Sequence, residues 1–243
     1  MQLLNNGHDL HAVIVGCSGG IGYALSQQLL NHPNVSAITG LCRNETHIDH
    51  PNFSQIQFDL KDADSIQNAT EQVKPFNLLI VATGILHEGQ LQPEKSLSTL
   101  RSPCMQELFL VNTIGPTLIL QGLLKKLVPN QPGIMAVISA KVGSITDNHL
   151  GGWYGYRSSK AALNMVMRCA SIEVQRFQSL HTVVSLHPGT VGTPLSEPFI
   201  KGYPAEAIFT PEKAASQLLD VINQIGPENN GTMLNWDGST LPF

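Results

Sequence analysis

The sequence predicts an α/β domain in which helices cover both faces of one doubly wound parallel sheet of about seven strands. Short apolar runs alternate along the chain with longer segments of helical periodicity, which is the order expected when parallel strands are joined by helical crossovers. The chain has 243 residues, of which 42% are hydrophobic and 13% charged, enough to build one large core. Because no repeat, linker or low-complexity tract interrupts the pattern, residues 1–243 are expected to form a single domain.

The predicted strands are 11–16, 35–43, 54–60, 77–84, 133–140, 181–189 and 231–238. The predicted helices are 21–30, a segment beginning near Asp62, 102–127, 154–178 and about 210–225. A doubly wound sheet binds its ligands outside the carboxyl ends of its strands. We therefore expect the functional residues at those ends.

Composition limits the classes of partner. The net charge is −4 and no run of Lys or Arg stands out, which argues against nucleic acid and against an anionic membrane surface. Small molecules are the expected partners. The four cysteines form no C-x-x-C pair and the histidines show no metal-ligand spacing, so we expect reduced thiols and no metal site. Residues 1–10 lack the pattern of an export signal and no apolar stretch reaches about 18 residues, so a cytoplasmic location is expected.

A glycine-rich turn, "GCSGGIG", follows the first predicted strand and contains Gly16, Gly20 and Gly22. Glycines let the backbone approach a pyrophosphate closely, and the start of a helix offers free N–H groups and positive dipole charge. A plain tight turn is the alternative. The strand–turn–helix context favours dinucleotide binding, with Ser18 and Ile21 as further contacts.

The ends of the second and third strands indicate which dinucleotide is bound. An acidic residue after the second strand would favour NAD, whereas this chain has Arg43 there. A guanidinium suits a 2′-phosphate, so NADP(H) is favoured and NAD(H) stays possible; a solvated surface arginine is the alternative. Asp59, followed by Leu60, could reach an adenine amino group or cap the helix near Asp62.

Two pairs of residues suggest catalysis. Tyr156 and Lys160 are four apart and share one helix face, where the ammonium would lower the phenol pKa from about 10 towards working pH and allow proton transfer. An ordinary amphipathic helix is the alternative. Pro116 lacks the N–H that would bond the Asn112 carbonyl, which leaves that oxygen free for water or marks only a bend.

The glycine-rich turn, Tyr156-x-x-x-Lys160, Asn112 and "PGTVGT" at 188–193 together resemble the short-chain dehydrogenases/reductases (SDR) over nearly the whole chain. The segments "VGSI", "GGWYGYRSSKAALN" and "NWDGSTLPF" are most similar to the carbonyl-reductase-like branch that includes the C-factor and sniffer proteins. The resemblance implies a Rossmann-type form of the predicted sheet. It also implies a homodimer or homotetramer that packs through the long helices, whose apolar faces lie at 117–124 and 161–170.

The resemblance also implies roles for the catalytic residues. Tyr156 would give a proton to a substrate carbonyl as the nicotinamide delivers hydride, and Lys160 would lower the tyrosine pKa and hold the nicotinamide ribose. The main-chain carbonyl of Asn112 would hold a water that links the lysine to solvent. A serine would orient the substrate carbonyl.

Further cofactor contacts follow from the resemblance. Thr193 would bond the nicotinamide carboxamide, and Pro188 with Gly189 would fix the preceding turn. In "VATG", at the end of the fourth strand, Ala82 and Gly84 stand where the family commonly has "NNAG". The lost asparagine amides would affect stability more than chemistry.

The serine is where the chain departs from the family pattern. The fifth strand ends in Ser139 and Ala140, and the family's serine would stand at the second of these positions. Ser144 lies twelve residues before Tyr156 and is favoured over Ser139, whose side chain period-two alternation would point away from the face of Ala140.

An irregular segment at about 190–210 is expected to form a substrate loop, either a lid or a plain surface loop. Residues that could wall an apolar pocket are Trp153, Leu195, Phe199 and Tyr203. The expected function is an NADP(H)-dependent reductase of an aldehyde or ketone, also able to oxidise the alcohol. The alternative is a cofactor-binding signalling or structural protein of the same fold with little or no turnover, a role suggested by the absent serine at Ala140.

Overall fold

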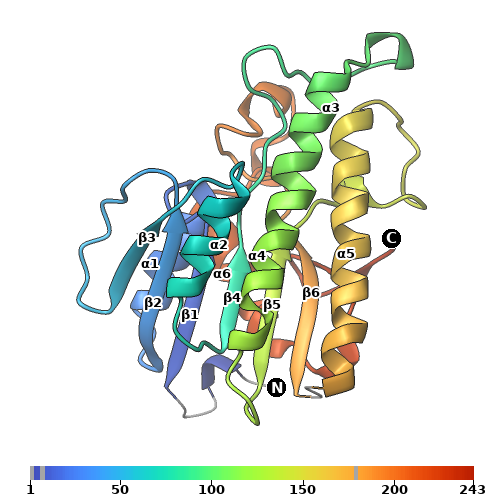
Figure 1. The fold of residues 1–243 in the computed structure, drawn as a ribbon. Coiled ribbons are helices and arrows are strands. Elements are labelled where there is room, and N and C mark those ends of the chain that lie inside the picture. The colour runs from blue at the N-terminus through green and yellow to red at the C-terminus, as the bar shows by residue number, and fades with distance from the viewer. Residues whose placement is uncertain (1–2, 6–8, 178–179) are drawn as a thin grey trace.

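The computed structural model describes residues 3–5, 9–177 and 180–243, and its centre is one eight-stranded sheet (Figure 1). The strand order is β3-β2-β1-β4-β5-β6-β7-β8, and all neighbours are parallel except β7 and β8. The strands are β1 (Leu10–Val15), β2 (Val35–Cys42), β3 (Phe53–Gln57), β4 (Leu78–Val81), β5 (Gly133–Ile138), β6 (His181–His187), β7 (Met233–Asn235) and β8 (Thr240–Leu241). The order reverses direction between β1 and β4, which confirms the predicted doubly wound α/β fold.

Helices cover both faces of the sheet, as the sequence predicts. They are α1 (Gly20–Leu30), α2 (Ala63–Gln72), α3 (Ser102–Phe109), α4 (Gly115–Leu123), α5 (Tyr154–Phe177) and α6 (Pro211–Gln224). The apolar residues of α1 and α6 share one core with one face of the sheet, and those of α2, α4 and α5 share a second core with the other face. Figure 1 views the molecule from the second side, with α4 and α5 in front of the strands.

The sheet has eight strands, one more than the approximate number predicted. After β7 the chain turns through Gly238, whose φ of 84° suits glycine, and β8 returns antiparallel to pair with β7. With only two residues, and Pro242 directly after it, β8 is too short to show an alternating pattern in the sequence. The added strand forms this edge of the sheet in place of β7.

The single helix predicted at 102–127 is interrupted. Between α3 and α4 lies a π-helical turn, Leu110–Ile114, in which the Gly115 N–H bonds the Leu110 carbonyl five residues back. Pro116 has no N–H to give to Asn112, so a wider turn is the local solution to the missing bond. The helical stretch 102–126 is long and apolar enough to span a membrane by composition alone, with a mean hydropathy of 1.4, but half of its most apolar window is buried in the domain.

The carboxyl ends of the parallel strands point to the top of Figure 1, where several irregular segments gather. These segments are the glycine-rich turn, the connection from β4 to α3, the loop from β5 to α5 and the stretch after β6. Since α3 and α5 both begin at this end, their first turns lie beside the same loops. This edge carries the candidate site.

Candidate active site

The glycine-rich turn brings α1 very close to β1. Gly16 has a φ of 89°, which a side chain would strain, and a Cβ on Gly22 would collide with the Gly16 carbonyl oxygen. The residue before α1, Gly19, offers no side-chain cap, and no acidic residue lies in the first turn. The N–H groups at the start of α1 are therefore available to an anion.

Next to this turn lies a cavity of about 280 Å³ between the ends of β1, β2 and β4. Of the predicted cofactor residues it is lined by Gly16, Ser18, Arg43, Asp59, Leu60, Ala82 and Gly84. Gly20, Ile21 and Gly22 do not line it; they form the start of α1 behind its wall. Lining residues that the sequence reasoning missed are Gly19, Cys42, Asn44, Phe58, Lys61, Thr83, Ile85, Glu88 and Val111. Most of these residues are adjacent in the sequence to predicted ones, and this adjacency is the signal from which they could have been predicted.

The cavity contains polar groups that suit a dinucleotide. The Thr83 hydroxyl is buried and has no hydrogen-bond partner among the residues that the structure describes, so it is free to bond a ligand. Arg43 lines the cavity, is exposed and forms no ion pair with any residue that the structure describes. Asp59 accepts a hydrogen bond from the Lys61 N–H at 2.9 Å, while the side chain of Asp62 caps α2. The alternative in which Asp59 caps that helix is therefore wrong.

Lys61 lies at the mouth of this cavity and pairs with two carboxylates. Its ammonium is 3.8 Å from Glu88 and also forms an ion pair with Glu107 of α3. The Glu107 carboxylate holds the pKa of Lys61 above its ordinary value. Through these pairs Lys61, which follows β3, is linked to the loop after β4 and to α3.

Tyr156 and Lys160 both lie buried on the inner face of α5, as their spacing predicts. The predicted electrostatics differ. Burial raises the pKa of Tyr156 to about 12 and lowers that of Lys160 to about 8. The ammonium of Lys160 donates to the Ile138 carbonyl at 3.0 Å. The predicted lowering of the tyrosine pKa by Lys160 is absent from this structure, because burial alone shifts the pKa of each group.

Asn112 is held by its side chain, in the π-helical turn. Its amide oxygen accepts from the Ile85 N–H at 2.8 Å, and its amide nitrogen donates to the Ile85 carbonyl and to the Ser159 hydroxyl. A Cβ on Gly84 would lie 3.3 Å from both the Asn112 amide oxygen and the Lys160 nitrogen. The structure thus brings Asn112, Lys160 and the end of β4 together. The Asn112 side-chain amide holds the segment after β4 against α5, a role that the sequence did not indicate.

The two candidate serines are both buried but have different surroundings. Ser144 follows Gly143, which packs against the backbone of Lys160, and its hydroxyl accepts a hydrogen bond from the Asp147 N–H at 3.1 Å. The Ser139 hydroxyl has no partner within the described part of the chain. Ala140 packs against the apolar cluster that contains Tyr156. The choice between Ser144 and Ser139 stays a prediction.

Aromatic residues from three segments cover Tyr156. Trp153 lies edge-on to both Tyr156 and Phe199, with ring centroids 6.2 and 5.2 Å away. His87 lies edge-on to Phe199 at 5.4 Å, and its ring nitrogen is 3.0 Å from the Pro194 carbonyl oxygen. Trp153 and Phe199 therefore form a wall, and His87 is a member that sequence reasoning missed.

The other two residues predicted to wall the pocket, Leu195 and Tyr203, differ in whether they contact the site. Leu195 packs against the cluster that contains Tyr156, whereas Tyr203 is 55% exposed. The substrate loop in which they lie contains only two short 3-10 turns, Glu197–Phe199 and Ala205–Ala207. The loop is thus irregular, as predicted, with its first half folded onto the site.

The segment after β6 reaches back to the glycine-rich turn. A Cβ on Gly20 would lie 2.9 Å from the Thr193 side chain, so the two segments are in contact. Gly189 has a φ of 78° and lies against the rings of Phe209 and Trp236, directly after Pro188. Thr193 is thereby placed between the glycine-rich turn and the substrate loop.

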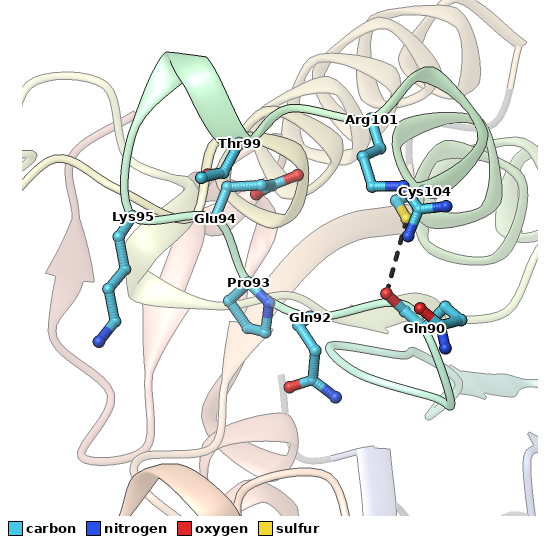
Figure 2. Close-up of a pocket in the computed structure, with 8 residues that line it drawn as sticks. All are labelled: Gln90, Gln92, Pro93, Glu94, Lys95, Thr99, Arg101 and Cys104. Atoms are coloured by element: carbon cyan, nitrogen blue, oxygen red, sulfur yellow. Dashed lines mark hydrogen bonds between the residues drawn. The ribbon is translucent and has the colours of Figure 1, made fainter.

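A second cavity, of about 290 Å³, lies beside the start of α5 (Figure 2). Its lining residues are Gln90, Gln92, Pro93, Glu94, Lys95, Thr99, Arg101 and Cys104. The buried Glu94 accepts a hydrogen bond from the Gly155 N–H at 3.1 Å through its carboxylate, and one from the Trp153 N–H through its main-chain carbonyl. Glu94 therefore fixes the first turn of the helix that carries Tyr156.

Known proteins share this fold and sequence pattern. The family model described as short chain dehydrogenase matches residues 10–203. An uncharacterised oxidoreductase of Saccharomyces cerevisiae is 30% identical over 99% of this chain and 100% of its own length. The NADPH-bound carbonyl reductase from chicken fatty liver has a TM-score of 0.84 and 25% identity, over 97% of this chain and 95% of that one.

Carbonyl reductase Sniffer of Drosophila melanogaster has a similar structure, with a TM-score of 0.82 and 24% identity over 97% of this chain and all of that one. These findings confirm the resemblance that the sequence motifs indicated, including its carbonyl-reductase-like character. The chain belongs to the short-chain dehydrogenase family of oxidoreductases.

Proposed function

We propose that the protein is an NADP(H)-dependent reductase of aldehydes or ketones, which also oxidises the corresponding alcohols. The observation that carries the proposal is the position of Gly84. It lines the cavity that contains Arg43, and it lies against Lys160 and Asn112 beside the helix of Tyr156. A dinucleotide bound in that cavity would therefore end next to the catalytic tyrosine.

The residues around the cavity fit such a coenzyme. The free N–H groups of α1 would hold the pyrophosphate, Arg43 the 2′-phosphate, and Asp59 the adenine amino group. Thr193, in contact with the glycine-rich turn, would bond the carboxamide. The bound nicotinamide supplies or accepts the hydride. The NADPH bound by the chicken carbonyl reductase supports the choice of NADP(H) over NAD(H).

The chain's own residues would move the proton. A pKa of about 12 keeps the Tyr156 phenol protonated at neutral pH, so it can donate to a carbonyl oxygen placed under the aromatic wall. Lys160, with a pKa of about 8, is close to its own titration point and can replace that proton through a water held at the Asn112 carbonyl. The Ser144 hydroxyl would orient the substrate oxygen.

The substrate class follows from the walls of the site. Tyr156 packs with aromatic and aliphatic side chains, to which the substrate loop adds Leu195 and Phe199. Such walls favour a carbonyl compound with an apolar substituent next to the reacting carbon. The carbonyl reductase activity named for the chicken and Drosophila proteins supports this class.

The long helices offer a surface for self-association. Met165, Cys169 and Ile172 lie at i, i+4 and i+7 on α5 and are exposed, as is Ile114 before α4. We infer a homodimer or homotetramer that packs through this face. Ile172→Glu should then lower the mass measured by light scattering to that of a smaller assembly, whereas a monomeric wild-type protein would contradict the inference.

The proposed function is tested in two stages. The purified protein is first titrated with NADPH and with NADH while fluorescence is followed, and tighter binding of NADPH is expected. A panel of apolar aldehydes and ketones is then added and nicotinamide absorbance is followed. Wild-type protein should oxidise NADPH in the presence of substrate, and Tyr156→Phe should bind NADPH normally but lose at least 100-fold in kcat, on the order of the general-acid contribution.

A different result would favour the non-enzymatic alternative. Tight NADPH binding without turnover by the wild-type protein across the panel would contradict the reductase. In that case Ala140→Ser, which restores a hydroxyl at the family's position, is the first variant to assay.

A further inference from the structure

Two cysteine thiols are in contact at the edge of the coenzyme cavity. Cys17 lies in the glycine-rich turn and Cys42 is the last residue of β2, and their sulfur atoms are 3.2 Å apart. Both are buried, at 0% and 2% exposure. Gly40 provides the space, since a Cβ there would lie 2.6 Å from the Cys17 sulfur. The function proposed above uses neither thiol.

We propose that Cys17 and Cys42 form a reversible disulfide with peroxide-class oxidants, and that this disulfide weakens coenzyme binding. Cys17 lies two residues after the end of β1 and Cys42 ends β2, and these strands are paired neighbours with Val15 opposite Leu41. Neighbouring strands lie about 4.8 Å apart, within the range of about 4.4 to 6.8 Å between Cα atoms that a disulfide spans. The sulfurs need to approach by about 1 Å to reach the bond length of about 2.05 Å.

The two thiols are not equivalent. The Cys17 S–H donates a hydrogen bond to the Cys42 sulfur, which lowers the pKa of Cys42 and raises that of Cys17; Ser18 also lowers the Cys42 pKa. Cys42 is therefore the nucleophile. It also lines the cavity, through which a small oxidant can reach it.

The reaction with hydrogen peroxide proceeds in two balanced steps. The Cys42 thiolate attacks one peroxide oxygen, so an S–O bond forms, the O–O bond breaks and hydroxide leaves as water after taking a proton. The Cys17 thiolate then attacks the Cys42 sulfur, the S–S bond forms and the second oxygen leaves as water. In total, two thiols and one peroxide give one disulfide and two waters, and a dithiol reductant reverses the change.

The disulfide would alter the part of the cavity that contains Arg43. In the reduced state the Cys42 thiol also donates to the Asn44 carbonyl at 3.1 Å, which holds the backbone on either side of Arg43. Oxidation removes that donor and draws the end of β2 towards the glycine-rich turn. The link to coenzyme binding rests on the proposed function, whereas disulfide formation does not.

Disulfide formation is tested in a Cys104→Ser/Cys169→Ser background, in which Cys17 and Cys42 are the remaining thiols. After hydrogen peroxide treatment, intact-mass analysis should show the loss of two hydrogen atoms and thiol titration should show no free thiol, both reversed by dithiothreitol. Adding Cys17→Ala should leave Cys42 as a sulfenic acid that a trapping reagent captures. Two thiols that persist in a folded protein, or a disulfide between two chains, would overturn the proposal.

The link to the coenzyme is measured on the same protein with NADP⁺, which does not reduce disulfides. The oxidised form should bind NADP⁺ about tenfold more weakly than the reduced form. Because the coupling is reciprocal, saturating NADP⁺ should raise the reduction potential of the Cys17–Cys42 disulfide. The rise should be about 30 mV for each tenfold difference in NADP⁺ affinity between the two forms. Equal affinity of the two forms would overturn the coupling. Failure of the reduced form to bind either nucleotide would instead overturn the proposed function, and would leave the disulfide result standing.

Discussion

The ammonium group of Lys160 donates a hydrogen bond to the main-chain carbonyl of Ile138, 3.0 Å away. This bond ties the catalytic face of α5 to the end of β5. The partner is neutral, and no carboxylate among the residues that the structure describes forms an ion pair with Lys160. The side chain is therefore a buried base whose charge is disfavoured, with a pKa lowered to about 8.

Stability should rise with pH as Lys160 loses its proton. The pKa is about 8 in the folded protein and 10.5 in the unfolded chain, so between these values the unfolded chain binds more protons and the free energy of unfolding increases with pH. From pH 7 to 9.5 this contribution is about 2 kcal/mol. Urea unfolding of Lys160→Met should lack that rise, whereas the exposed-site variant Lys201→Met should keep it. Parallel curves for wild type and Lys160→Met would contradict the lowered pKa.

Acid should destabilise the protein through His187. Its ring nitrogen accepts a hydrogen bond from the Lys141 N–H, and burial together with the Lys141 charge lowers its pKa from 6.5 to about 4. Between these values only the unfolded chain takes up the proton, so about 1 to 2 kcal/mol of stability should be lost from pH 7.5 to 5. His187→Asn keeps the acceptor and should flatten this part of the curve in thermal or urea unfolding. His47→Asn, at an exposed site, should leave the slope unchanged.

Arg43 should determine the choice between the two nucleotides. A guanidinium on the 2′-phosphate contributes about 1.5 to 3 kcal/mol, so Arg43→Ala should weaken NADPH binding about 10- to 100-fold and change NADH binding little. Fluorescence titration measures both affinities. Arg176→Ala, at the far end of α5, is the matched control. An equal loss for both nucleotides would place Arg43 outside the phosphate site.

Glu94 should matter for the geometry of Tyr156 rather than for chemistry. Its carboxylate accepts from the Gly155 N–H at the start of α5, so Glu94→Ala should cost about 1 to 2 kcal/mol of stability and lower kcat. Glu94→Gln keeps an acceptor oxygen and should restore most of both. The control Glu173→Ala, at an exposed position on α5, should alter neither the stability nor kcat. Loss of activity in Glu94→Gln at full stability would indicate a direct role for the charge.

The fold was largely predictable because buried parallel strands appear as apolar runs, such as "AVIV" before Gly16. The strand β8 was missed because two residues carry no periodicity, and the π-helical turn was missed because helical spacing does not distinguish a wider turn within one helix. A proline such as Pro116 signals an interruption but not its form. The expectation of one domain over 1–243 stays a prediction.

The site was predictable where chemistry depends on local spacing, as in the glycine-rich turn and the Tyr156–Lys160 pair. The site was not predictable where its properties depend on the burial of a side chain or on contacts between residues far apart in the sequence. The phenol pKa moved in the unexpected direction because spacing reveals a neighbour but not the extent of burial. Glu94 and His87 bond to segments far away in the sequence, and nothing adjacent to them signals this.

Phe199 packs between Trp153 and His87, and these three rings come from three separate segments of the chain. The wall residues that belong to the substrate loop, Leu195 and Phe199, lie in no strand of the sheet and do not line the coenzyme cavity. Its shape can therefore change independently of the reaction chemistry. Under the proposed function, exchange of residues 194–207 for those of another family member would change which carbonyl compound fits the site, while Tyr156 and the coenzyme cavity stay as they are.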